Sequence, residues 1–386
     1  MRKPKKNPNG AGSIRQRSDG TWEARYTQEI HAGTGKQIRK SVYGKTQQEV
    51  RQKLAQITVE LDSGTFIEPS RLTVGEWLDM WLADYVKISV KLTTYQTYER
   101  KCRGNIKPHL AAVKLSALTA PAIQKMINRL NEDLSPKSVK CIHGILHKAL
   151  QQAVSLGYIR ANPADACKLP KLVKKEITPL DKEEISAFID AVRGHEFETL
   201  YLVTLFTGVR QSEAIGLRWR CVDFETGRIL INGQLLRDYA AGGYYFDEST
   251  KNNKSRHIAP AKFVMAALKK HKVEQMKARM LAGSAWIESD YVFTNESGEH
   301  LKHVTVYKGY KRIVSELGIP TARYHDLRHS YAVAAIRAGD DVKTVQENLG
   351  HHTAAFTLDQ YGHVTENMKR ESADRMDMYI ANALAP

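Results

Sequence analysis

The sequence predicts a multidomain α+β protein, in which a small three-stranded sheet with one helix precedes an all-helical bundle and a mostly helical domain with short β-hairpins. Three observations predict this order. Apolar and polar residues alternate between residues 13 and 43, as in strands with one buried face. Beyond that region, apolar residues recur mostly at helical spacing. Two prolines and four lysines within residues 168–179 indicate an extended linker.

The first predicted domain covers residues 1–66 and contains the alternating segments. Turn-forming residues separate them, so we expect three strands joined by short turns, at 13–17, 22–30 and 37–43. A helix should follow, because Thr46 and Glu49 have the spacing of a capping box. Its apolar residues form one stripe, which predicts a helix packed against one face of the sheet.

The second predicted domain, residues 67–173, has only helical signals. Thr73 and Glu76 form a second capping box, and Ser135 followed by Pro136 marks a further helix start. The aromatic residues from Trp77 onward recur every four positions, which we interpret as core packing. The expected helices after the first are 94–106, 120–131 and 136–156.

The third predicted domain, residues 174–386, mixes helices with short strands. A length of 386 residues fits such a division better than one compact domain. The expected helices are 182–193, 197–207, 211–217, 262–281, 304–317, 326–338 and 342–348. The expected strands are 228–232, 256–259 and 291–294.

The positive charge of the chain is concentrated in its first half. The formal net charge is +16, of which residues 1–66 carry +7, residues 67–173 carry +8 and residues 174–386 carry +1. A basic half favours an extended polyanion such as nucleic acid as the partner. The plainer interpretation is that the charge only keeps the protein in solution.

Several classes of protein are not expected from the sequence. The four cysteines lie far apart, which gives neither metal-ligand spacing nor a disulfide framework. The N-terminal residues are charged and lack the apolar stretch of a secretory signal. No run of about 18 apolar residues occurs that could span a membrane. We therefore expect a cytoplasmic protein that has no membrane partner.

Basic side chains in the first two domains are candidates for contacts with DNA. A three-stranded sheet can enter the major groove, and we expect one face of this sheet to present its cations to solvent. A plain solvated face is the alternative. The candidates on the sheet are Arg15, Arg17, Arg25, Arg39 and Lys40, and those on the helical bundle are Lys91, Arg100, Lys101 and Lys140.

Arg210 is the first residue of the third domain with a distinctive setting. It follows one predicted helix and precedes another, in a turn that Gly208 makes possible. We expect its guanidinium at a helix N-terminus, where anions are favoured, with Glu213 as a brace. A surface arginine is the plainer interpretation.

His325 and Arg328 lie three residues apart on a predicted helix, so both should project from one face. Imidazoles move protons near neutral pH, and arginine binds phosphate oxygens in pairs. A polar helix start is the plainer interpretation. His325 and His329 also have a spacing found in zinc sites, but no glutamate follows His325 and no third ligand is evident, so we expect no metal.

Tyr361 follows the sequence Leu349-Gly350-His351 by ten residues. A free phenol has a pKa of about 10 and attacks well only beside cations or a base. Packing of an amphipathic tyrosine is the plainer interpretation. A polar turn between two predicted strands carries Lys251, which could act as a mobile acid, although the composition does not distinguish it from Lys254.

This ordered set of residues resembles the tyrosine recombinases, the lambda-integrase-like site-specific recombinases. The resemblance covers residues 180–386. Residues 12–26 are similar to an arm-type DNA-binding domain, and residues 72–166 are similar to the helical core-binding domain of that family. The layout resembles integrases of temperate phages and conjugative transposons.

The resemblance implies a role for each residue of the set. Tyr361 would attack the scissile phosphate and give a 3′-phosphotyrosyl link, while Lys251 protonates the 5′-oxygen. Arg210 and Arg328 would clamp the nonbridging oxygens. His325 would act as general acid and base, and His351, rather than its neighbour His352, would hydrogen-bond the phosphate.

The resemblance also implies partners. It implies double-stranded DNA with core and arm attachment sites, a homotetramer on DNA, an excisionase and a host DNA-bending protein, and no cofactor or metal. Two alternatives remain. One is an enzyme like the type IB topoisomerases, against which the arm domain argues. The other is a DNA-binding architectural or regulatory protein without strand exchange.

Overall fold

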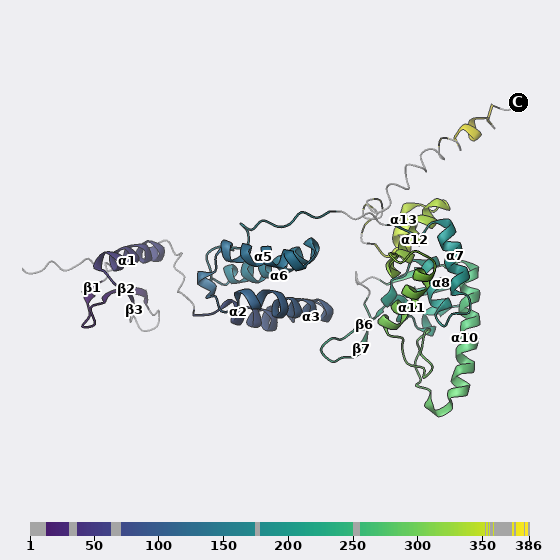
Figure 1. Cartoon of the computed structure of the whole chain (residues 1–386), viewed down its shortest axis with the longest axis horizontal. Helices are drawn as coiled ribbons and strands as arrows, with labels where there is room; N and C mark the ends of the chain where they lie inside the picture. Colours follow the sequence, from purple (N-terminus) through teal and green to yellow (C-terminus); the bar gives the residue numbers. More distant parts are fainter. Residues whose placement is uncertain are drawn as a thin grey trace, which may run out of the picture. The chain divides into compact units, whose positions relative to one another are not determined.

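The computed structural model describes residues 13–30, 37–62, 71–173, 178–249, 255–351 and, beyond them, 353, 355, 358, 373, 376–381, 383 and 384. The chain divides into two compact units, Met1–Leu172 and Val173–Pro386 (Figure 1). The predicted α+β class is confirmed, with a small antiparallel sheet first and helices dominating the rest. No helix among these described residues is long and apolar enough to cross a membrane.

The first unit begins with the predicted sheet. Strands β1 (Ser13–Gln16), β2 (Trp22–Ile30) and β3 (Gln37–Gly44) pair antiparallel in the order β1-β2-β3. Helix α1 (Gln47–Asp62) packs on the face that carries Ala24, and Val50 and Leu54 complete a small core there. The backbone amide of Glu49 donates to Thr46 Oγ1 at 3.2 Å, so Thr46 caps the helix as the sequence predicts.

The basic residues of the sheet lie on its predicted solvent face with one exception, Lys40. Arg39 lies opposite Thr27, whereas Lys40 lies opposite Tyr26, whose side chain is buried toward α1. Neighbouring residues of a strand point to opposite faces. Lys40 therefore lies on the helix side and is half-buried, and its predicted place on the solvent face beside Arg39 is wrong.

The rest of the first unit is the predicted helical bundle, and two of its helices continue into π-helical turns. Trp77 is fully buried, and its indole nitrogen donates to the carbonyl of Ala149 at 2.9 Å, so the aromatic stripe is core as predicted. The helices are α2 (Val74–Met80) with a π-turn at Trp81–Val86, α3 (Leu92–Lys101) with a π-turn at Cys102–Ile106, α4 (Lys107–Leu110), α5 (Ala120–Asp133) and α6 (Pro136–Ser155).

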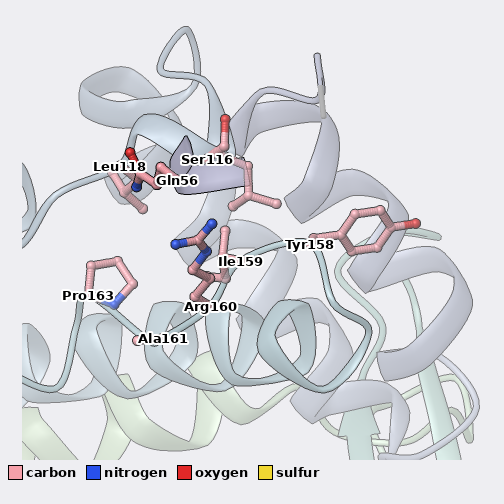
Figure 2. Close-up of a pocket in the computed structure, with 9 residues that line it drawn as sticks. Gln56, Ser116, Leu118, Tyr158, Ile159, Arg160, Ala161 and Pro163 are labelled. Atoms are coloured by element: carbon pink, nitrogen blue, oxygen red, sulfur yellow. The ribbon is translucent and has the colours of Figure 1, made fainter. Parts of the chain in front are cut away.

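The loop after α6 closes the bundle. Gly157 has a φ of 75° and ends the helix where the sequence predicts. Figure 2 shows that Tyr158, Ile159 and Arg160 then line a pocket whose walls also include Ser116 and Leu118. The loop packs back onto the bundle, since Ile159 belongs to its core.

The second unit surrounds one large core with helices. Its helices are α7 (Lys182–Val192), α8 (Glu198–Thr207), α9 (Gln211–Ile215), α10 (Lys262–Ala282), α11 (His303–Glu316), α12 (Tyr324–Arg337) and α13 (Val342–Leu349). Its strands are β4 (Val222–Asp223), β5 (Arg228–Ile231), β6 (Gln234–Arg237), β7 (Tyr244–Asp247) and β8 (Arg256–Ile258). They form a sheet in the order β4-β5-β8. Strands β6 and β7 form a separate hairpin, which Figure 1 labels.

The predicted strand at 291–294 is wrong. Tyr291 and Thr294 make only isolated bridges, to Arg218 and His300 respectively. The amide of Val292, between them, donates to the carbonyl of Leu217 in a loop rather than to a neighbouring strand. Among the described residues, the pairing of this segment thus stops at single bridges, although its composition favours a strand.

Candidate active site

Arg210 lies at the start of α9, as predicted. Gly208 ends α8 with a φ of 66°, and the chain then turns so that Arg210 takes the N-cap position of α9. The backbone amide of Arg210 donates to Glu213 Oε2 at 3.0 Å, and its Nη1 donates to Glu213 Oε1 at 2.7 Å. The predicted brace is confirmed, and it holds both the backbone and the guanidinium of Arg210.

Arg328 is almost entirely buried on α12, with 2 % of its surface exposed. Its Nη1 donates to the carbonyl of Gly208 at 2.6 Å, and its Nη2 donates to the carbonyl of Leu349 at 2.6 Å. A buried charge is tolerated only where hydrogen-bond partners replace water. Arg328 thus joins the turn before Arg210 to the end of α13.

His351 follows the end of α13, where Gly350 has a φ of 63°. Arg210 Nη2 donates to the carbonyl of Gly350 at 3.2 Å. Gln346 fixes the same turn with two hydrogen bonds. Its side-chain Nε2 donates to the backbone carbonyl of His351 at 2.6 Å, and its backbone carbonyl accepts from the backbone amide of His351 at 3.0 Å. Both arginines and His351 therefore meet at the C-terminal turn of α13.

His325 and His329 lie one helical turn apart on α12, with ring centroids 4.9 Å apart in an edge-to-face arrangement. Burial, followed by the nearby charges of His329, Arg328 and Arg210, lowers the pKa of His325 to about 4. Burial and the same two arginines lower the pKa of His351 to about 3. Both imidazoles are therefore neutral near pH 7, and each can donate or accept a proton.

The two histidines of α12 do not complete a metal site in the described part of the chain. No group of three histidine, cysteine, aspartate or glutamate side chains that could hold a metal ion occurs there.

Arg256 is a residue of this cluster that the sequence analysis missed. It lies on β8, and its guanidinium pairs with Glu213, with Nη2 to Oε2 at 2.7 Å and Nη1 to Oε1 at 3.1 Å. The available signal was its place five residues after Lys251 in the same polar segment.

Lys251 and Tyr361 lie outside the residues that the structure describes, and so do the alternatives Lys254 and His352. The strands that flank the lysine segment do not form one hairpin. Strand β7 pairs with β6, and β8 pairs with β5.

The basic side chains of the sheet are partly engaged with Glu23. Arg15 lies opposite the buried Glu23 on the neighbouring strand, and its Nε contacts a carboxylate oxygen at 2.7 Å. Arg25 lies two residues further along the strand of Glu23, and its Nε contacts the other oxygen at 3.1 Å. Hydrogen bonds from Ser41, Arg15 and Arg25 lower the pKa of Glu23 to about 2. Arg17 lies over the ring of Tyr43, with the guanidinium carbon 5.4 Å from the ring centroid.

The candidates on the bundle come from two helices. Lys91 precedes α3 as its N-cap, and Arg100 and Lys101 lie in its last turn. Lys140 lies in the second turn of α6. A basic last turn also favours the helix dipole of α3, which is a structural reason for Arg100 and Lys101.

Comparisons with known proteins match most of the chain to one family. The model of the phage integrase family matches residues 178–368, and the model of the phage integrase N-terminal SAM-like domain matches residues 73–131. A tyrosine recombinase XerC-like protein of Caldanaerobacter subterraneus subsp. tengcongensis is 30% identical over 365 residues, which are 90% of this chain and 93% of the relative. The ICEBs1 integrase of Bacillus subtilis is 25% identical, covering 95% of this chain and 99% of its own.

Solved structures share the fold. The Tn1549 transposon integrase bound to transposon right end DNA has a TM-score of 0.68 at 22% identity, covering 79% of this chain and all of that chain. A lambda integrase dimer bound to a core site has a TM-score of 0.60 at 19% identity, covering 94% of this chain and 97% of that chain. Together with the 30% identical relative, these matches confirm the resemblance. The chain belongs to the phage integrase family and is a tyrosine-type site-specific recombinase.

Proposed function

We propose that this recombinase integrates and excises a mobile genetic element through a 3′-phosphotyrosyl intermediate. The observation that supports the proposal most directly is the meeting of Arg210, Arg328 and His351 at the end of α13. Guanidinium and imidazole groups gathered at one turn are suited to hold one phosphodiester. Similar proteins whose names include a phage or a transposon, such as the integrase of Staphylococcus phage L54a and the Tn1549 transposon integrase, support the choice of substrate.

In the proposed cleavage step, Tyr361 Oη attacks the scissile phosphorus and forms a new P–O bond. The bond to the 5′-oxygen breaks, and Lys251 donates the proton that this leaving oxygen takes up. Rejoining reverses the step, when the 5′-hydroxyl of a new strand attacks the phosphotyrosine. The number of phosphodiester bonds is unchanged, so the reaction needs no external energy source.

The arginines supply the charge that this step requires. Arg210 is 19 % exposed, so part of its guanidinium is available to a nonbridging oxygen while Glu213 holds the remainder. Arg328 is deeper and fixes the carbonyl groups of Gly208 and Leu349, next to the proposed phosphate site. Fixed donors aimed at developing negative charge lower the barrier without reorganisation.

The histidines supply neutral donors and acceptors. In the proposal, His325 takes the proton of the Tyr361 hydroxyl, and His351 hydrogen-bonds the phosphate. Their lowered pKa values keep both imidazoles neutral near pH 7, so each ring has one nitrogen that donates and one that accepts.

The first two domains would hold the DNA. We propose that residues 1–66 bind arm sites, that residues 67–173 bind core sites together with the catalytic domain 174–386, and that four copies assemble on the DNA. An excisionase and a host DNA-bending protein complete the proposed partners in the cytoplasm. The lambda integrase tetramer bound to a Holliday junction supports the assembly.

Covalent capture tests the reaction. The substrate is a nicked duplex that spans the joined ends of the element, so that cleavage releases a short fragment and traps the adduct. Wild type should give a protein–DNA adduct on a denaturing gel, and Tyr361→Phe should bind equally and give none. Tyr379→Phe, which alters an exposed tyrosine of the tail, is the matched control and should retain the adduct. An adduct with Tyr361→Phe would refute the assignment.

A sulfur substitution tests the acid. Replacing the 5′-bridging oxygen with sulfur gives a leaving group of pKa about 8.5, which departs without a proton. Lys251→Ala should lose activity on the ordinary substrate and recover it on the sulfur substrate. Lys254→Ala should behave like wild type on both, and the opposite pattern would identify Lys254 as the acid.

A further inference from the structure

Arg256 occupies the centre of the contacts behind Arg210. Its side chain is 10 % exposed and binds Glu213 with two nitrogens. Its third nitrogen, Nε, donates to the carbonyl of Asn348 at 2.7 Å. One guanidinium thus joins β8, the start of α9 and the end of α13.

The last turn of α13 is packed tightly against this side chain. A Cβ added to Gly350 would lie 3.0 Å from Arg256 Nη1. The carbonyl of Gly350 accepts from Arg210, and His351 follows directly. The position of both phosphate-binding candidates therefore depends on where Arg256 lies.

The positive charge of Arg256 also affects the electrostatics around Glu213 and Arg210. Glu213 is buried, with 1 % of its surface exposed. Burial alone would raise its pKa, but the hydrogen bond and charge of Arg256, followed by the charge of Arg210, lower the pKa to about 2. Paired with Arg210 alone, this carboxylate would cancel the charge that a phosphate meets, because opposite charges at contact distance form a neutral pair. A second guanidinium leaves the three-residue cluster with one net positive charge.

We infer that Arg256 is a positioning residue for strand cleavage: it fixes Glu213 and the end of α13, and it keeps Arg210 electrostatically positive toward the scissile phosphate. The inference rests on the proposed function of Arg210. Arginine suits this place better than lysine, because three separate acceptors need the planar fork and Nε of a guanidinium.

The first test measures the rate of adduct formation for Arg256→Met, which retains an unbranched side chain without charge. Saturating DNA separates the rate from binding. We expect cleavage about 10²-fold slower than wild type, the size of effect seen when one preorganised charge is lost. Arg256→Lys should lie between the two, because it restores the charge without the fork. Arg279→Met, which removes an exposed arginine paired with Glu288, is the control and should match wild type.

A neutral substrate separates charge from structure. In a methylphosphonate linkage, a methyl group replaces one nonbridging oxygen, so less negative charge needs stabilisation. Measured against wild type on the same substrate, the loss for Arg256→Met should shrink to less than about tenfold. An equal loss on both substrates would mean that Arg256 only holds the fold and would overturn the inference.

The double variant Glu213→Gln/Arg256→Met gives an independent answer. It restores one net positive charge to the cluster, and it also avoids an unbalanced buried carboxylate if Arg256→Met alone folds poorly. Cleavage should recover at least about tenfold relative to Arg256→Met. A double variant as slow as Arg256→Met would overturn the inference. If wild type itself gives no adduct, the proposed function fails instead, so the two failures are distinct.

Discussion

Arg210 donates a hydrogen bond from Nη2 to the carbonyl oxygen of Gly350 at 3.2 Å, although 140 residues separate the two along the chain. The contact places the guanidinium beside His351 and explains why the turn at the end of α13 is part of the site. It also separates the two arginines by function. Arg210 lies at the edge of the cluster, and Arg328 lies inside it.

Removing Arg328 should therefore cost more stability than removing Arg210. Arg328→Ala leaves the carbonyls of Gly208 and Leu349 without their donor, so we expect a loss of about 3 kcal/mol or more in the free energy of unfolding. Arg210→Ala should cost about 1–2 kcal/mol, because Glu213 retains Arg256. Urea unfolding of both variants measures the difference. Equal losses would contradict the division between a buried and an accessible arginine.

Gly208 should tolerate no side chain. A Cβ there would lie 2.4 Å from Tyr331 Cδ1 and 2.6 Å from Leu349 Cδ2, and its φ of 66° is already unfavourable for other residues. Gly208→Ala should lose about 3 kcal/mol, from backbone strain together with overpacking. Gly194→Ala is the matched control, since its φ is 75° and nothing lies within 4 Å of an added Cβ.

Gly194→Ala should lose only about 1 kcal/mol, because strain remains without a clash. Thermal unfolding and the adduct assay should both rank Gly208→Ala below Gly194→Ala. Equal losses in the two variants would show that the positive φ at the helix end, and not the close approach of Tyr331 and Leu349, makes residue 208 intolerant of a side chain.

The catalytic unit should lose stability as the pH falls from about 6.5 toward 4. Burial, with neighbouring charges, lowers the pKa of His325 and His329 to about 4 and that of His351 to about 3, from an ordinary value of 6.5. In this window the unfolded chain binds protons that the folded chain excludes, so protons favour unfolding. Below about pH 4.5, protonation of Glu213 in the unfolded chain adds to the loss.

Urea unfolding at a series of pH values measures this dependence. His351→Asn removes one of these buried histidines, so its free energy of unfolding should fall less steeply between pH 6.5 and 4 than that of wild type. A slope that does not change in this variant would contradict the burial of a neutral His351.

The faces of the N-terminal sheet predict different effects of two neighbouring residues on DNA binding. Arg39 lies on the exposed face, whereas Lys40 lies on the side of α1. If the exposed face contacts phosphates, Arg39→Ala should weaken binding to an arm site and reduce the slope of log affinity against log salt by about 1. Lys40→Ala should leave the slope unchanged. Titrations at several salt concentrations test both, and equal slopes for the two variants would refute contact through this face.

The sequence by itself determined the class of the fold and the order of most elements, and it named the candidate residues of the site in chain order. These features are local. The N-cap at Thr46, the capping box at Thr73, the helix end at Gly157 and the turn at Gly208 each depend on a few neighbouring residues. Glu213 could be named as the brace of Arg210 because the two lie one helical turn apart.

Only the tertiary structure decided which of these residues meet. Strand β8 pairs with β5 rather than β7, and residues 291–294 make only isolated bridges within the described part of the chain. Lys40 lies on the inner face because register, not composition, fixes orientation. Arg256 was missed for the same reason, since Glu213 lies 43 residues away and Asn348 lies 92 residues away. Hydrogen bonds and charges act over a few ångströms in space, and sequence patterns record only neighbours along the chain.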